Sequence, residues 1–173
     1  MALIKTKAIV LSSLKYGDTS LIVRCFTLED GLRSYLLKGV LSAKKRKVKA
    51  AYFQPLTQLN IEANHNSKGN LNSIREVHII HPYKHIYTNI FKQTIVLFLS
   101  EILSSTIQEE ESNKSLFSFL ETSFIWLDTN DKTSNFHLLF LLNLTKFLGF
   151  YPNITNSDFT YFNLMNGDFT ETT

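Results

Sequence analysis

Cysteine is almost absent from this chain of 173 residues, which contains only Cys25. A single cysteine excludes an internal disulfide framework and any zinc site built from several cysteines. No apolar run approaches the roughly 18 residues that cross a membrane. Lysines at positions 5 and 7 interrupt the apolar start that a secretory signal needs. The sequence therefore predicts a cytoplasmic protein with no membrane span.

Motifs of the common catalytic sites are missing as well. There is no G-x-x-x-x-G-K-[ST] phosphate loop, and Ser12-Ser13 is not in the setting of a nucleophile elbow. The acidic residues of the first half occur singly, so a two-metal nuclease would have no carboxylate cluster. His78, His81 and His85 have a spacing that suggests metal ligands, but Pro82 breaks the segment and no cysteine or aspartate joins them. We therefore expect no enzyme, no metal site and no cofactor.

What the chain does have is an uneven distribution of charge. Residues 1–85 contain 14 basic and five acidic side chains, a net charge of +9. Residues 86–173 contain four basic and ten acidic side chains, a net charge of −6. Such asymmetry predicts two modules with different partners, of which the basic one meets a polyanion.

The densest positive charge lies in residues 38–49, between two predicted strands. Five of the six residues 44–49 are basic, and no acidic residue follows within ten positions. Like charges at this spacing repel each other, so the loop favours contact with a polyanion such as nucleic acid. The alternative is a solvated surface loop without a ligand. The candidate phosphate contacts are Lys38, Lys44, Lys45, Arg46, Lys47 and Lys49.

The first 82 residues have the pattern of strands joined by short turns. Ser12-Ser13 and Tyr16-Gly17-Asp18 are typical of turns, and Asp30-Gly31 suits a tight hairpin. Five strands without room for crossover helices predict a small antiparallel barrel of the oligonucleotide-binding (OB) type. The predicted strands are residues 6–11, 21–26, 32–38, 57–63 and 71–80.

In the second half the apolar residues recur at helical spacing. A helix is predicted over residues 87–108, a second around the apolar positions 116–127, and a third over residues 134–148. Gly149 is placed to cap the third helix at its carboxyl end. The acidic segment Glu109-Glu110-Glu111 predicts a solvated connection between the first two helices.

The last residues have a different pattern again. Residues 158–173 resemble a short hairpin with Asn166-Gly167 at its turn. The chain as a whole is therefore expected to be an α+β protein. We predict an OB-fold domain in residues 1–82 and a helical domain in residues 83–173.

Four more side chains of the predicted barrel are candidates for the nucleic-acid interface. Arg24 and Arg33 flank the expected sheet face and could contact phosphates, or could be ordinary surface charges. Tyr35 and Tyr52 could stack on bases, a contact worth about 1–3 kcal/mol per base when it forms. The alternative for both tyrosines is packing in the core or at its rim.

Six short motifs carry a resemblance to a known family. They are Lys7-Ala8-Ile9-Val10-Leu11, Tyr16-Gly17-Asp18-Thr19-Ser20-Leu21-Ile22-Val23, Phe26-Thr27-Leu28-Glu29-Asp30-Gly31, Lys38-Gly39, Gln54-Pro55 and Leu148-Gly149-Phe150-Tyr151-Pro152. In order and spacing this set resembles the RecO family of bacterial recombination mediators. The resemblance implies an OB barrel that binds single- and double-stranded DNA, and a helical domain.

The resemblance also implies an activity and partners. RecO family members anneal complementary strands and, with their partner RecR, help to load recombinase onto strands coated by single-strand-binding protein. The C-terminal tail of that protein would bind the helical domain, in a groove formed by exposed parts of the apolar stripes at 116–127 and 136–147. Association with the nucleoid follows from the same resemblance.

Two departures from the family pattern are visible. Several relatives carry a four-cysteine zinc module where this chain has Asn153-Ile154-Thr155-Asn156, so we expect no zinc. The chain also ends at Thr173, which predicts either a C-terminally truncated chain or a naturally short member. Two other interpretations remain open, an RNA-binding OB-fold protein and a protein-interaction adaptor without catalytic activity.

Overall fold

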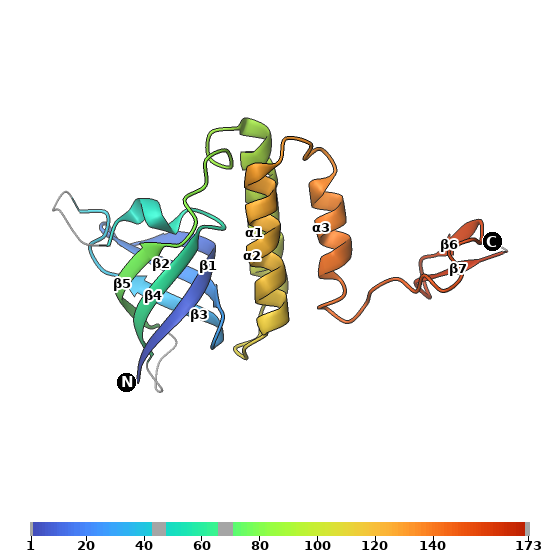
Figure 1. The fold of residues 1–173 in the computed structure, drawn as a ribbon. Coiled ribbons are helices and arrows are strands. Elements are labelled where there is room, and N and C mark those ends of the chain that lie inside the picture. Colours follow the sequence, from blue (N-terminus) through green and yellow to red (C-terminus); the bar gives the residue numbers. More distant parts are fainter. Residues whose placement is uncertain (1, 43–47, 66–70, 172–173) are drawn as a thin grey trace. The chain divides into compact units, whose positions relative to one another are not determined.

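The computed structural model describes residues 2–42, 48–65 and 71–171 (Figure 1). The chain divides into two compact units, Met1–Lys132 and Thr133–Thr173. The first unit contains a β-barrel and two helices, and the second contains a short helix and a hairpin. The predicted α+β class is confirmed. The boundary between residues 82 and 83 stays a prediction.

Five antiparallel strands in the order β3-β2-β1-β4-β5 form the sheet of the first unit. The sheet closes into a barrel next to β5, where Leu36 N–H donates to Asn72 O at 2.9 Å and Asn72 N–H donates to Ser34 O at 2.8 Å. This closing contact is a parallel bridge between Tyr35 and Asn72, whereas the paired strands of the sheet are antiparallel. A small five-stranded barrel is typical of the OB fold. The strands are β1 Ala2–Tyr16, β2 Ser20–Thr27, β3 Gly31–Leu37, β4 Gln58–His65 and β5 Ser73–Ile79.

Strand β1 is much longer than the predicted segment 6–11, because it continues for 15 residues. The prediction of a turn at Ser12-Ser13 is wrong, since these serines pair with Arg24 and Val23 of β2. A register shift between Val10 and Ser12 marks a bulge, which bends a strand without ending it. The residues after the bulge therefore form a hairpin with β2.

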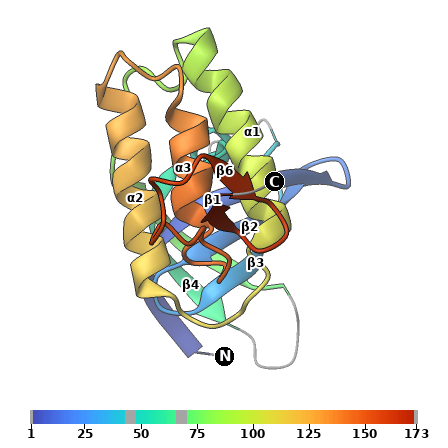
Figure 2. The same cartoon turned by 90° about the vertical axis from the view of Figure 1, so that its right-hand side faces the viewer.

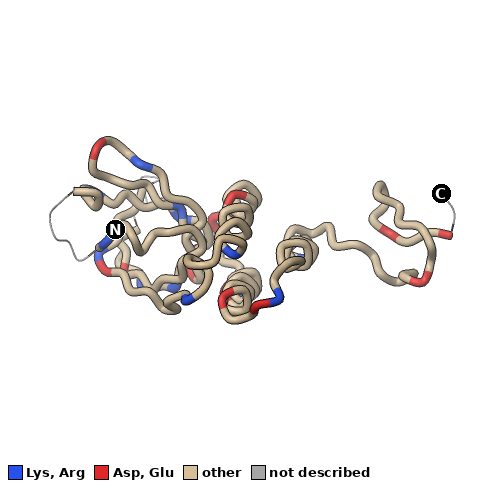
Figure 3. Tube along the Cα trace, turned by 90° about the horizontal axis from the view of Figure 1, so that it is seen from above, with Lys and Arg blue, Asp and Glu red and all other residues tan. Residues whose placement is uncertain are grey.

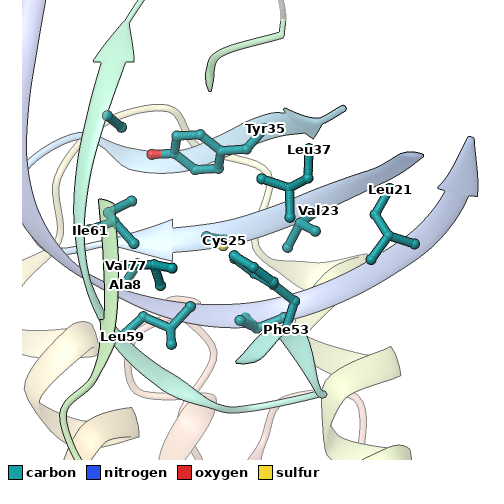
Figure 4. Packing of buried hydrophobic residues seen from close by; sticks show 12 residues of the cluster. Ala8, Leu21, Val23, Cys25, Tyr35, Leu37, Phe53, Leu59, Ile61 and Val77 are labelled. Carbon is teal, nitrogen blue, oxygen red and sulfur yellow. The ribbon is translucent and has the colours of Figure 1, made fainter. Parts of the chain in front are cut away.

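One apolar cluster fills the interior of the barrel (Figure 4). Its members alternate along the strands, because successive side chains of a strand point to opposite faces. The short 3-10 helix η1, Ala50–Phe53, adds Phe53 to the cluster. The other members are Ala8, Val10, Leu21, Val23, Cys25, Tyr35, Leu37, Leu59, Ile61, Ala63 and Val77.

Two helices, α1 (Ile90–Thr106) and α2 (Lys114–Thr129), lie side by side beside the barrel (Figures 1 and 2). Ile9, Leu11 and Phe26 are buried although they do not belong to the cluster inside the barrel. The ring of Phe26 lies 6.0 Å from that of Phe117 on α2. A second apolar core therefore lies between the outer face of the sheet and the helix pair.

Both helices begin at an asparagine cap. The side chain of Asn89 accepts hydrogen bonds from the N–H groups of Phe91 and Lys92, and that of Asn113 accepts one from Leu116 N–H. Such caps satisfy backbone donors that have no partner within the helix. Because Asn89 is the cap, α1 begins three residues later than the predicted start at residue 87.

A buried carboxylate fixes the segment that leads from the barrel into α1. The oxygens of Asp128 on α2 accept the N–H groups of Lys84, His85 and Ile86 at 3.0, 2.8 and 2.9 Å. Burial raises the pKa of Asp128, but the three backbone donors outweigh it and hold the pKa below its ordinary value of 3.8. The buried Lys92 Nζ donates to the backbone O of Asp128 at 2.8 Å.

The second unit contains helix α3, Phe136–Leu144, and a hairpin of β6, Tyr161–Asn163, with β7, Asp168–Thr170. The helix is shorter than predicted and ends at the cap Thr145, so Gly149, although it has a left-handed φ of 81°, does not cap it. The predicted hairpin is confirmed, with the rings of Phe162 and Phe169 5.0 Å apart. Across the residues that the structure describes, no helix has both the length and the apolar character to cross a membrane.

Candidate nucleic-acid interface

The basic loop leaves the barrel from a stem that is hydrogen-bonded to the β1–β2 turn. Gly39 N–H donates to Ser20 Oγ at 3.1 Å, and Leu41 N–H donates to Thr19 O at 2.9 Å. Lys38 at the start of the stem is exposed. Lys44, Lys45, Arg46 and Lys47 lie outside the described residues. The described part of the loop is therefore anchored at one end of the barrel.

The return of the loop carries two predicted site residues, Lys49 and Tyr52. Lys49 is exposed, and its Nζ lies 6.0 Å from the centre of the Tyr52 ring, at the outer limit of a cation–π contact. Tyr52 is half-buried and packs against the barrel cluster together with Val40 and Val48. A half-buried ring beside an exposed lysine is compatible with contact to a base and a phosphate.

The structure gives Arg24 and Arg33 structural partners. Arg24 donates to Ser104 O at 3.3 Å and to Gln108 Oε1 at 3.4 Å, at the carboxyl end of α1. Arg33 donates to Glu110 Oε2 at 2.7 Å and to Glu110 O at 3.3 Å. Both guanidinium groups thus bind the end of α1 or the connection that follows it. Through these contacts the two arginines link the barrel to the helix pair.

The acidic connection 109–111 is exposed, as predicted, but it is also docked on the barrel, which the sequence did not predict. Besides the Arg33 contacts, Leu32 N–H donates to Glu109 O at 3.0 Å. Gly31, at φ +62°, leaves room for the backbone of this segment, because a Cβ there would lie 2.9 Å from Glu109 O and overlap the carbonyl of Glu111. Lys114 and Glu29 add an ion pair of 3.3 Å nearby.

Tyr35 is fully buried in the barrel and cannot stack on a base in this conformation. Its hydroxyl lies 3.1 Å from His65 Nε2, and His65 Nδ1 lies 3.1 Å from Asp30 Oδ2. Burial raises the pKa of Tyr35, and it lowers the pKa of His65 although Asp30 opposes that shift. Of the two weighed roles, core packing is the one that the structure supports for this tyrosine.

The three histidines that suggest a metal site do not converge. His81 Nε2 lies 3.9 Å from Asp128 Oδ2, whose carboxylate is already bonded to three backbone N–H groups. His78 belongs to β5, and His85 is linked to Asp128 through its backbone. In residues 2–42, 48–65 and 71–171, no three His, Cys, Asp or Glu side chains come together as metal ligands would.

A cavity of about 480 Å³ opens on the barrel wall formed by β1, β4 and β5. Lys5 and Lys7 line it, but Lys5 pairs with Glu62 at 3.2 Å and Lys7 pairs with Glu121 at 2.7 Å. Glu29 and Glu76 also line this cavity. Its lysines are thus balanced by carboxylates, which makes it a poor site for phosphates.

Sequence reasoning missed the tip of the β1–β2 hairpin. Leu14, Lys15 and Tyr16 are exposed there, next to the turn that bonds the stem of the basic loop. The sheet register places Lys15 opposite Leu21, and Leu21 opposite Leu37, the residue before Lys38. The sequence signal is Leu14-Lys15-Tyr16, a lysine between an apolar and an aromatic residue directly before the turn. This pattern looks like ordinary strand and turn composition.

The described Lys and Arg positions are spread over the barrel and the helices (Figure 3). The barrel has the OB topology, and its loop 38–49 carries the densest positive charge of the sequence, so fold and charge place the protein in the class of OB-fold barrel proteins with a basic loop.

Comparison with known proteins agrees. Residues 1–83 match the family Recombination protein O N terminal, and residues 87–171 match Recombination protein O C terminal. The DNA repair protein RecO of Flavobacterium johnsoniae is 54% identical over 167 residues, which cover 96% of this chain and 70% of that protein. The corresponding protein of Bacteroides fragilis is 42% identical over 168 residues, covering 96% and 69%. The chain belongs to the RecO family of DNA repair proteins.

Proposed function

We propose that this protein binds DNA through the end of the barrel that carries the basic loop and anneals complementary strands without catalysing a reaction. The observation that carries the proposal is the hydrogen-bonded stem, Gly39 to Ser20 and Leu41 to Thr19, which holds the loop against the β1–β2 turn. Lys38, Lys49 and Tyr52 belong to the same stem and its return. Lys44, Lys45, Arg46 and Lys47 extend the basic sequence between them.

The mechanism is electrostatic. Cationic side chains neutralise phosphates on two strands, which lowers the repulsion between them and lets complementary bases meet. Binding of this kind depends weakly on sequence and strongly on salt, because each neutralised phosphate releases counterions. Both single- and double-stranded DNA can be bound by such a surface. Arg24 and Arg33 would contribute only if DNA displaced their present partners.

The partners follow from the family. We propose that the protein acts with RecR and with single-strand-binding protein, whose C-terminal tail binds the helical part. Exposed apolar side chains on α1 and α3, among them Phe91, Leu97 and Leu139, support a peptide-binding role for these helices. Phe117, Leu120 and Phe124 cannot serve, since they are buried.

The central test reverses the charge of the loop in the variant K44E/K45E/R46E/K47E. A matched control, K84E/K114E/K132E/K146E, changes the net charge equally at four exposed lysines outside the barrel loop. We expect the loop variant to lose at least about tenfold in DNA affinity at moderate salt and to show a shallower salt dependence. Strand annealing should slow in parallel, whereas the control should stay much closer to the wild type.

Unchanged affinity and salt slope in the loop variant would remove the loop from the binding site. Competition between RNA and DNA of equal length separates the proposal from an RNA-binding function. A wild-type protein that binds RecR or the tail of single-strand-binding protein but no nucleic acid would instead be an adaptor.

A further inference from the structure

The tip of the β1–β2 hairpin exposes apolar surface that the fold does not use. Leu14 is 64% exposed and Tyr16 is 56% exposed. They are two residues apart on β1 and therefore lie on the same face of the strand. Their cross-strand partners are Ile22 and Ser20. Two large apolar side chains at the end of a hairpin, outside both cores, form a small platform.

The position of this platform is set by the sheet. The turn Gly17-Asp18-Thr19 follows directly, with Gly17 at φ +60°. Thr19 and Ser20 accept the hydrogen bonds from the loop stem described above. Since these bonds join hairpin and stem, Leu14 and Tyr16 are carried on the same end of the barrel as Lys38.

Charge indicates what the platform meets. Lys38 follows Leu37, and the register of Leu37 with Leu21 and Lys15 puts Lys38 at the level of Ser20 and Tyr16, on the face of the platform. Lys15 lies between Leu14 and Tyr16 in sequence and points to the opposite face of the same hairpin tip, so both faces of the tip carry a lysine. The acidic residue of the tip is Asp18, in the turn itself. A cationic setting disfavours another basic surface and favours a polyanion that also carries flat apolar groups, which is the chemistry of a single nucleic-acid strand.

We propose that Tyr16 stacks on an unpaired base of single-stranded DNA while Leu14 packs against the same base or its neighbour. This inference rests on the proposed DNA binding and adds the base contact that phosphate neutralisation alone lacks. A base held by stacking leaves its pairing edge open, so the strand can be presented for annealing. In duplex DNA the bases are stacked on each other, so the tip discriminates single strands from duplexes.

The test compares two single-stranded probes of equal length, an ordinary oligodeoxynucleotide and one made of abasic units with the same phosphates. Wild type is expected to bind the ordinary probe at least about fivefold more tightly. Tyr16→Ala should lose most of that preference with its salt slope unchanged, because no phosphate contact is removed. Tyr16→Phe should keep the preference. Tyr161→Ala, at an exposed tyrosine of the other unit, is the matched control and should behave as wild type.

The outcomes separate the two proposals. A wild type that binds neither probe overturns the proposed function. A wild type that binds both probes equally overturns the stacking inference alone, whatever the variants do. The same holds if Tyr16→Ala, with an unchanged melting temperature, keeps the full preference. If RNA is preferred over the abasic probe as strongly as DNA is, the stacking contact stands, but the bound strand is then any single-stranded nucleic acid and not DNA alone.

Discussion

At the scale of single residues, Asp128 is a charged side chain buried inside the protein. It is 1% exposed, and its two oxygens satisfy three backbone donors of the segment between β5 and α1. A buried carboxylate is costly unless it is fully hydrogen-bonded, so the three donors are what stabilise its charged form. The donors depend equally on Asp128, since a backbone N–H left unpaired inside the protein is also costly.

Replacing Asp128 by alanine should therefore destabilise the protein by about 3 kcal/mol. The control is Asp131→Ala, an exposed aspartate three residues away, which should change stability by less than about 0.5 kcal/mol. Urea unfolding at pH 7 measures both. If Asp128→Ala lowers the free energy of unfolding no more than the control does, the three hydrogen bonds make no net contribution to stability.

The same residue predicts a dependence on pH. The pKa of Asp128 is lower in the folded protein than its ordinary 3.8, so its stabilising effect is complete above that value. The effect is lost as the pH falls through the folded-state pKa, because protonation then removes the charge in both states. The difference in unfolding free energy between wild type and Asp128→Ala should accordingly shrink below about pH 4.

At the scale of elements, the connection between α1 and α2 is held on the barrel by polar contacts. Its backbone bonds Leu32, and its Glu110 side chain meets Arg33. The sequence predicted that this acidic segment connects the two helices, but it did not predict the docking. A carboxylate run has the same appearance in a solvated turn and in a docked one, and the partner arginine lies 77 residues away in the chain.

Gly31 tests this docking, with Gly17 as a matched control. Both have a positive φ, +62° and +60°, so alanine costs about 1–2 kcal/mol in backbone strain at either site. Gly17 has open space around it, whereas a Cβ at Gly31 would overlap the backbone of the 109–111 segment. Gly31→Ala should therefore destabilise by about 2 kcal/mol more than Gly17→Ala in denaturant unfolding. Equal costs would show that the segment moves away freely.

The prediction of elements succeeded where one physical signal dominated. The alternation of apolar and polar residues predicted both ends of β4 to within about two residues. The helix cap at Asn89 is a residue type typical of caps, but the predicted start of the first helix did not take it into account. The prediction failed at Ser12-Ser13, because serines have turn composition and only pairing with β2 reveals a strand. For the site, the basic loop lies between two strands as predicted, but its hydrogen bonds to the β1–β2 turn were not foreseen. The burial of Tyr35 depends on barrel closure at Asn72, a long-range contact without a local signal.

At the scale of the whole molecule, the barrel and the helix pair belong to one compact unit, Met1–Lys132. Ile9, Leu11 and Phe26 are buried outside the barrel interior, so a fragment ending at residue 82 would expose them. We expect residues 1–132 to unfold in one cooperative transition, and residues 1–82 to aggregate or melt at a lower temperature. Calorimetry of the two fragments distinguishes this from independent folding of the predicted domain 1–82.

The single cysteine has a use beyond packing. Cys25 is fully buried in the barrel cluster, and burial raises the pKa of its thiol to about 12. A thiol that is neither accessible nor ionised does not react with alkylating reagents. Since the chain has no other cysteine, the rate at which it becomes alkylated reports how often the barrel opens. The alkylation rate of Cys25 in the native protein therefore measures the opening of the barrel. If DNA binds at the barrel, we expect this rate to fall when DNA is added.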